Sequence, residues 1–216
     1  MSEHFVSRGF SGRPRAPNGG RLPPGQYIET GFPVLSAGPT PHIALVDWSF
    51  TIRHGGDLPA GTPPGAGASA RWSWDEFTAL PHDTVTKDIH CVTKWSKFDT
   101  KWEGISLDTL LDAAESKGVS RAGYLVAVCE GGYTTNLALA DVTGGKAWIA
   151  FGYDGAPLAA EHGGPARLLV PHLYFWKSAK WIRELVLHDV DEPGFWEVNG
   201  YHNRGDPWKE ERYSGD

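Results

Sequence analysis

The stretch IHCVTKWSKFDTKWEGISL, residues 89–107, places Cys91 at the downstream end of an extended segment. Residues 84–92 are rich in β-branched side chains and lack helical periodicity, so they predict a strand. Three lysines follow and favour the thiolate form of the cysteine: Lys94, Lys97 and Lys101. A thiolate serves as a nucleophile or as a soft-metal ligand. Taken alone, however, this segment favours Cys91 as a packing residue, because free cysteines are among the most buried residues.

The segment ISLDTLLDAAESKG, residues 105–118, predicts the clearest helix of the chain. Ser106 is a favourable N-cap, and Gly118 stands where a helix commonly ends. The apolar residues of the segment fall on one helical face: Leu107, Leu110, Leu111 and Ala114. The pattern is that of an amphipathic helix packed on a core.

Strands outnumber helices in the rest of the sequence. Extended apolar runs predict strands at residues 42–52, 84–92, 124–129, 147–153, 166–171 and 181–190. A short helix is predicted where Ser73 and Glu76 form a capping box and Pro81 stops the run. The Gly- and Pro-rich residues 55–70 predict a surface loop. Since strands and helices do not alternate regularly, we expect an α+β domain of mixed β-sheets and short helices.

Composition limits the classes of function. A chain of 216 residues with 40% hydrophobic residues buries one substantial core. A formal net charge of -6 argues against a nucleic-acid binder, which needs a concentrated positive surface. No stretch approaches the roughly 20 apolar residues of a membrane span, and the N-terminus lacks an apolar leader. We therefore expect a cytoplasmic protein whose two cysteines, Cys91 and Cys129, stay reduced.

The N-terminal residues form a distinct segment. Residues 1–25 are rich in Gly, Pro and Arg and predict an extended arm, whereas residues 26–216 form the domain proper. The arm carries four arginines: Arg8, Arg13, Arg15 and Arg21. They either dock on the acidic body or on a second subunit, or they remain solvated.

The segment around Cys91 resembles the cofactor-binding domain of the sulfite oxidase family, which includes the periplasmic methionine sulfoxide reductase catalytic subunit. In that family a cysteine at a strand end binds molybdenum, whose other sulfur ligands come from the pterin ene-dithiolate. A thiolate suits this metal because both are polarisable. The resemblance implies a sulfite oxidase-type fold, a Mo-molybdopterin cofactor, and Cys91 as the metal ligand at the catalytic centre.

A second match lies in DGAPLAAEHGGPARLLVP, residues 154–171, followed by FWKSAKWIREL, residues 175–185. The resemblance implies that five residues contact the pterin and its terminal phosphate: His162, Arg167, Ser178, Ala179 and Lys180. Arginine grips a phosphate with two donors, lysine adds a point charge, and a loop supplies backbone N–H groups. These residue types therefore suit the implied ligand.

Three further positions follow from the resemblance. In YIETGFPVLS, residues 27–36, Thr30 and Gly31 correspond to cofactor contacts, and Glu29 replaces an arginine of the sulfite oxidases. Glu130 occupies the place of a small polar or acidic cofactor contact, and Tyr201 that of a catalytic tyrosine near the metal-bound oxygen. Because a carboxylate repels a dianion, Glu29 argues against sulfite as the substrate.

Ten tryptophans are many for a chain of this length. Four of them flank the matched segments: Trp95, Trp102, Trp176 and Trp181. Most are expected in the core, and some are expected to wall the cofactor pocket and exclude water.

The leading hypothesis is a molybdenum pyranopterin oxidoreductase that transfers an oxygen atom, with two electrons, to or from a small substrate such as an S-oxide, an N-oxide or a related oxyanion. No haem or flavin segment is visible, so electrons are expected to pass through a separate protein carrying flavin, haem or an iron–sulfur cluster. One alternative is a Cys91 nucleophile activated by His90 or His162. Another is a relative that holds the cofactor without turnover. The oligomeric state stays open.

Overall fold

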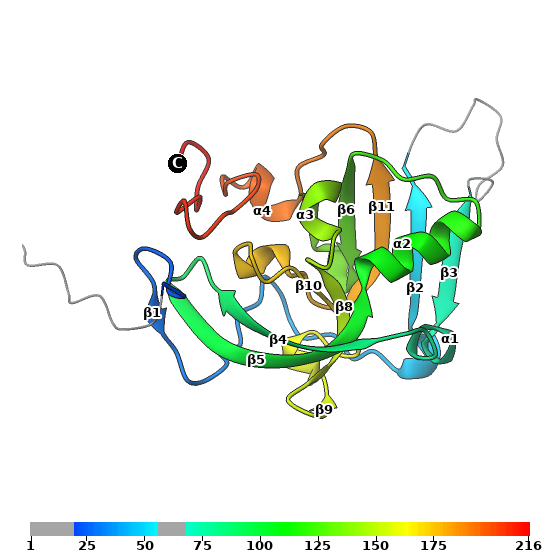
Figure 1. Cartoon of the computed structure of the whole chain (residues 1–216), viewed down its shortest axis with the longest axis horizontal. Helices are drawn as coiled ribbons and strands as arrows, with labels where there is room; N and C mark the ends of the chain where they lie inside the picture. The colour runs from blue at the N-terminus through cyan, green and yellow to red at the C-terminus, as the bar shows by residue number, and fades with distance from the viewer. Residues whose placement is uncertain (1–19, 56–67) are drawn as a thin grey trace, which may run out of the picture.

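Two β-sheets build the body of the computed structural model, which describes residues 20–55 and 68–216 (Figure 1). The first sheet contains β1 (Tyr27–Ile28), β4 (Asp83–His90), β5 (Trp95–Ser106), β8 (Trp148–Tyr153), β9 (Ala156–Pro157) and β10 (Arg167–Leu169). The second contains β2 (Ser49–His54), β3 (Ser69–Ser73), β6 (Tyr124–Cys129), β7 (Thr134–Ala138) and β11 (Ile182–His188). The neighbour order is β1-β5-β8-β10 in the first sheet and β3-β2-β11-β6-β7 in the second.

Helices are short among the described residues, as the sequence predicts. The α-helices are α1 (Trp74–Thr78), α2 (Leu107–Ser116), α3 (Leu139–Val142) and α4 (Phe195–Val198). Single 3-10 turns are η1 (Leu45–Asp47), η2 (Glu130–Gly132), η3 (Ala160–His162) and η4 (Phe175–Lys177). In the described part of the chain, none of these helices has the length and apolar character needed to cross a membrane.

The predicted signals for α1 and α2 are confirmed. Ser73 and Glu76 form the reciprocal capping box of α1. The Ser106 hydroxyl accepts the backbone N–H of Thr109 at 3.1 Å and caps α2. The predicted apolar face of α2 is fully buried: Leu107, Leu110, Leu111 and Ala114. Burying each leucine contributes about 1.5–3 kcal/mol, so this face anchors the helix to the core.

The β4–β5 hairpin carries Cys91 at its tip. The strand predicted at residues 84–92 ends at His90, and Cys91 is the first residue of the connection. The Cys91 N–H donates to Trp95 O at 2.8 Å, and Lys94 N–H donates to Cys91 O at 3.0 Å, which closes a tight turn. The long strand β5 was not among the predicted strands, because its charged, outward-facing residues interrupt the apolar pattern.

Two other predicted strands differ from the structure. The segment predicted at residues 42–52 begins instead with the 3-10 turn η1, and β2 starts at Ser49. Residues Leu45 and Val46 are exposed, so they gain nothing from a buried strand face. The segment predicted at residues 166–171 is paired only over β10.

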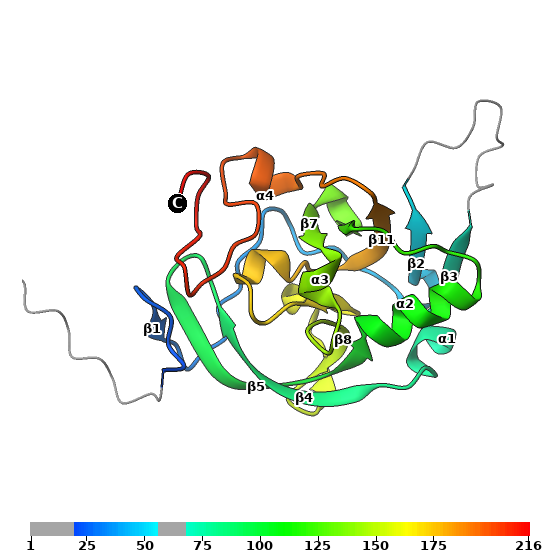
Figure 2. The ribbon, with the colours of Figure 1, turned by 45° about the horizontal axis from the view of Figure 1, so that its top comes forward.

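The C-terminal segment and the described end of the predicted arm both pack near the hairpin tip (Figure 2). Residues 1–19, with Arg8, Arg13 and Arg15, and residues 56–67 of the predicted loop lie outside the described residues. Arg21 docks on the body: its guanidinium pairs with Asp88 at 2.5 Å and with Asp99 at 2.7 Å. Of the alternatives predicted for the four arginines of the arm, docking on the body is therefore observed for Arg21.

Candidate functional site

The thiol of Cys91 is buried, with 7% of the residue exposed. Burial raises the pKa of this thiol, and the Thr93 hydroxyl, which donates to Sγ at 3.1 Å, lowers it in part. The predicted lysine effect is wrong. Lys94 and Lys101 are exposed, and Lys97 donates to Thr30 O at 2.5 Å. Metal binding itself can displace the proton of such a thiol.

Five aromatic rings form a wall beside Cys91, hereafter the aromatic wall: Phe32, Trp95, Trp102, Tyr153 and Phe175. The Phe32 ring lies at its centre, 5.1 Å from the Tyr153 ring and 6.0 Å from both the Trp102 and Phe175 rings. The same apolar cluster contains Cys91. Cys91 therefore belongs to an apolar and largely aromatic cluster, and its burial limits contact with water.

Arg167 ties two predicted cofactor segments together from within the protein. Its guanidinium donates to His162 O at 2.7 Å and to Ser178 O at 2.5 Å, and only 1% of the residue is exposed. The guanidinium also lies over the Phe175 ring at 4.2 Å, which connects it to the aromatic wall. Burial lowers the pKa of Arg167 to about 9. Among the described residues, no carboxylate lies within ion-pairing distance of this buried cation.

Lys180 and His162 extend this positive group. Lys180 Nζ donates to Glu161 O at 2.6 Å, and burial, with Arg167 second, lowers the pKa of Lys180 to about 8. The His162 ring stacks on Phe32 at 3.9 Å between centroids, and its Nδ1 is buried without a partner in the described chain. Burial and these two cations lower the pKa of His162. We call the two cations Arg167 and Lys180, together with the His162 ring beside them, the cation cluster; the lowered pKa of His162 favours its neutral form.

Glycine allows the two segments of the cation cluster to approach. Gly163 has φ +110, and a Cβ there would lie 3.0 Å from Arg167 Cβ and 3.1 Å from Lys180 Cα. The Ser178 hydroxyl accepts Val170 N–H at 2.8 Å, and Ala179 O accepts Leu168 N–H at 2.8 Å. Both residues are buried, so they fix the segment beside β10.

Thr30 and Gly31 lead the chain into the aromatic wall. Both are exposed, and the next residue, Phe32, carries its ring onto His162. The Glu29 carboxylate accepts the Gly31 N–H at 2.8 Å, so it acts locally as a cap for this turn. The sequence resemblance covered Thr30 and Gly31 but not Phe32, whose only signal was its place directly after them.

Glu130 and Tyr201 lie at different edges of the site. Glu130 follows β6; its N–H donates to Trp181 O at 2.9 Å, but its carboxylate pairs with Arg183 at 2.8 Å. Tyr201 stacks on Trp196 with centroids 4.8 Å apart. Burial first, then Tyr213, and last the Cys91 thiol raise the pKa of the Tyr201 phenol. The role predicted for each residue stays a prediction.

No histidine is placed to activate Cys91 within the described ranges. The His90 ring contacts Ser96 Oγ at 2.8 Å, and burial lowers the pKa of His90 to about 4. The His162 ring stacks on Phe32 instead. The hydroxyl that donates to the Cys91 sulfur is that of Thr93. This geometry disfavours the cysteine–histidine nucleophile.

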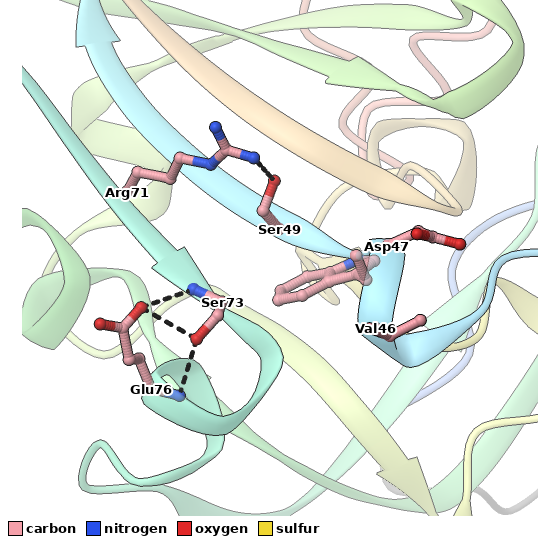
Figure 3. A pocket seen from close by; sticks show the side chains of 7 residues that line it. Val46, Asp47, Ser49, Arg71, Ser73 and Glu76 are labelled. Carbon is pink, nitrogen blue, oxygen red and sulfur yellow. Dashed lines mark hydrogen bonds between the residues drawn. The ribbon is translucent and has the colours of Figure 1, made fainter.

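Two surface hollows lie outside this site. One, of about 580 Å³, is lined by residues of η1, β2, β3 and α1. Figure 3 shows that its polar groups bond to one another: Arg71 reaches Ser49, and Glu76 reaches Ser73. The other, of about 530 Å³, is lined in part by His90, Asp141 and Arg204. Arg204 is bound to Asp141 there, and among the described residues the cations that line the two hollows are exposed or half-buried, unlike Arg167.

Comparison with known proteins gives a consistent set of matches. Residues 37–196 match the model described as oxidoreductase molybdopterin binding domain. The chain is 41% identical over 199 residues to YuiH of Bacillus subtilis, named an uncharacterized oxidoreductase, with 91% of this chain and 94% of that protein covered. It is 33% identical over 132 residues to YedZ1 of Azospira oryzae, named a putative protein-methionine-sulfoxide reductase subunit, covering 61% of this chain and 49% of that protein.

A solved structure shares the fold. The sulfane dehydrogenase SoxCD from Paracoccus pantotrophus superposes with a TM-score of 0.57 at 19% sequence identity, over 70% of this chain and 41% of that chain. At this identity the likeness concerns the fold alone. It confirms the predicted architecture of mixed sheets with short helices.

Proposed function

We propose that this chain, which belongs to the oxidoreductase molybdopterin binding domain family, catalyses two-electron oxygen-atom transfer to or from a small substrate. The family membership confirms the predicted resemblance and the predicted cofactor, Mo-molybdopterin, and makes the chain an oxidoreductase. The direction of transfer and the substrate belong to the proposal.

The buried cation of Arg167, which has no carboxylate partner within residues 20–55 and 68–216, is the observation that carries the proposal. Burying a cation costs several kcal/mol unless a negative charge compensates it. With Lys180 beside it and an unpartnered Nδ1 on His162, the cation cluster suits a phosphate and a hydrogen-bonding heterocycle. The residues present therefore fit a pyranopterin with its phosphate.

Each part of the site has a task in this proposal. The bound cofactor supplies a two-electron couple at molybdenum. Cys91 would hold the metal through Sγ, and Arg167 and Lys180 would hold the phosphate. The aromatic wall keeps water from the thiol side, and Thr93 supports the sulfur with a hydrogen bond. Reduction of an oxide XO consumes two electrons and two protons and releases X and water. The Tyr201 phenol is the group proposed to face the transferred oxygen.

The proposed substrates are an S-oxide, an N-oxide or a related oxyanion, with an S-oxide favoured. The similarity to a putative protein-methionine-sulfoxide reductase subunit supports this order. Glu29 supports it too, since a carboxylate stands where the resemblance places an arginine that attracts sulfite. We propose a separate electron donor carrying flavin, haem or an iron–sulfur cluster. The cytoplasmic location stays a prediction of the sequence.

The test is metal and pterin analysis of the purified protein, followed by oxidant screening. The molybdenum centre is reduced with dithionite, and its reoxidation is followed after addition of dimethyl sulfoxide, trimethylamine N-oxide, nitrate or buffer. Reoxidation fastest with the sulfoxide supports the proposal. A centre that binds molybdenum but is inert to every oxidant supports the non-catalytic alternative, and metal-free protein with full activity contradicts both.

A further inference from the structure

A buried ion pair joins two segments that border the site. Lys177 Nζ lies 2.6 Å from Glu197 Oε1, and each side chain is only 1% exposed. Lys177 ends η4 and directly precedes Ser178 of the cofactor segment. Glu197 belongs to α4, a few residues before Tyr201. The pair therefore links the segment proposed to hold the phosphate to the segment that carries the proposed catalytic tyrosine.

The two charged groups of the pair differ in how completely they are hydrogen-bonded. Lys177 also donates to Asn136 O at 2.8 Å and to Asn136 Oδ1 at 3.0 Å, so all three of its protons have acceptors. Glu197 Oε1 accepts from Thr135 at 3.0 Å and from Trp176 at 2.9 Å besides Lys177. Glu197 Oε2 is buried without a partner among the described residues. Such a pair adds little stability over apolar side chains, which favours a role in specifying geometry.

The same pair controls both rings that hold Tyr201. The Trp176 indole donates to Glu197 and contacts the Tyr201 ring edge-on at 5.0 Å. Trp196, the neighbour of Glu197 in α4, stacks on Tyr201 at 4.8 Å, and its carbonyl accepts the Tyr201 N–H at 3.0 Å. Moving Glu197 would therefore move Tyr201.

The segment that follows Tyr201 rests on the hairpin that carries Cys91. The Arg212 guanidinium donates to the Tyr174 hydroxyl, and Tyr174 forms a backbone bridge with His90. The Trp208 ring lies 6.2 Å from the His90 ring. Figures 1 and 2 both show the C-terminal segment beside the hairpin tip. The ion pair and the hairpin thus hold this segment from two sides.

We propose that Lys177 and Glu197 are positioning residues whose ion pair fixes η4 to α4 and so sets the position of the Tyr201 ring. This inference rests on the proposed function for its catalytic consequence. Neither residue touches the cofactor in the proposal. Each acts through Trp176, Trp196 and Tyr201.

The test combines Glu197→Gln and Tyr201→Phe, singly and together, in the molybdenum-loaded protein. With dimethyl sulfoxide and reduced benzyl viologen, each single variant should lower kcat about tenfold to a hundredfold and change KM less than about twofold. The double variant should be no slower than the worse single variant, because both changes act on one group. Losses that multiply in the double variant, or a change confined to KM, would overturn the inference.

Hydrogen exchange over residues 195–213 provides a readout that needs no turnover. Glu197→Gln should accelerate exchange there with and without cofactor, whereas Asp112→Asn, which breaks an exposed pair with Arg121, should not. Lys177→Met with Glu197→Leu replaces the pair by apolar side chains of similar volume, and circular dichroism checks that this variant is folded. It should still lower kcat, and a wild-type kcat in this variant rejects the positioning role. Unchanged hydrogen exchange in Glu197→Gln also rejects the positioning role. If the purified wild-type protein contains no molybdenum, only the proposed function is rejected.

Discussion

Two arginines differ in their counter-charges: Arg204, in the hollow lined in part by His90, and Arg167, against the aromatic wall. Arg204 donates to both Asp141 oxygens at 3.0 Å and to Asp206 at 3.1 Å. Arg167 has a comparable number of hydrogen bonds, but all its acceptors are backbone carbonyls. The first cation is neutralised within the protein, and the second keeps its full charge in a buried place.

The titration behaviour follows the same division. Hydrogen bonds to Asp141 hold the pKa of Arg204 above its usual value, and His172, with Arg204, holds the pKa of Asp141 below its usual range. Burial instead lowers the pKa of Arg167 and of Lys180. An anion gains most where a cation is desolvated and unpaired. Arg167, which lacks a carboxylate partner among the described residues, therefore suits an external anion, whereas Arg204 and Asp141 form a structural ion pair.

The largest expected effect is the loss of metal in Cys91→Ser. A hydroxyl replaces the soft ligand, so molybdenum per chain should fall close to zero by elemental analysis. Cys129→Ser is the matched control, because Cys129 is also buried but lies in the other apolar cluster. Metal retained in Cys91→Ser, or lost equally in both variants, would contradict the ligand assignment.

The next effect tests the comparison directly. Arg167→Met should lower the pterin content at least about tenfold, since it removes both the charge and the tie between His162 and Ser178. Arg204→Met should leave the pterin content unchanged, because its charge is spent on Asp141 and Asp206. Pterin fluorescence after extraction measures both. Equal losses in the two variants would show that the counter-charge is irrelevant.

Lys180 gives the comparison a pH dependence. Its pKa is lowered from 10.5 to about 8, and a bound anion would raise it again. Cofactor retention should therefore weaken as pH rises through about 8 to 10.5. The cofactor-free chain has the opposite sign: the unfolded lysine stays protonated up to 10.5, so this group makes stability rise over that window. The measurement is the cofactor retained after dialysis at several pH values, in wild type and in Lys180→Met. If the loss of cofactor between about pH 8 and 10.5 persists in Lys180→Met, Lys180 is not its cause.

The smallest effect is expected at Arg21. Its exposed guanidinium pairs with Asp88 and Asp99 at the surface, where solvent screens the attraction. Arg21→Gln should leave the cofactor content and the thermal unfolding midpoint unchanged within error. A clear drop in the midpoint would mean that the arm contributes to the fold through this contact.

Several features were predictable because they depend on neighbours in the chain. The capping box of α1, the buried face of α2 and the strand β6 at residues 124–129 follow from local spacing. The turn at Asp154 and Gly155, with φ of 51 and 79, is likewise a local feature of an Asp-Gly pair. The family resemblance rested on short motifs, and the order and spacing of these motifs are properties of the sequence alone.

The sequence by itself determined that a strand leads up to Cys91 and that a basic, glycine-containing loop follows far downstream. Only the tertiary structure decided which charges are compensated. It turned Lys94 and Lys101 to solvent, brought Phe32 onto His162 and left Arg167 without an acid. It also joined Lys177 to Glu197. Compensation and burial depend on contacts between residues distant in sequence, and no local pattern specifies them.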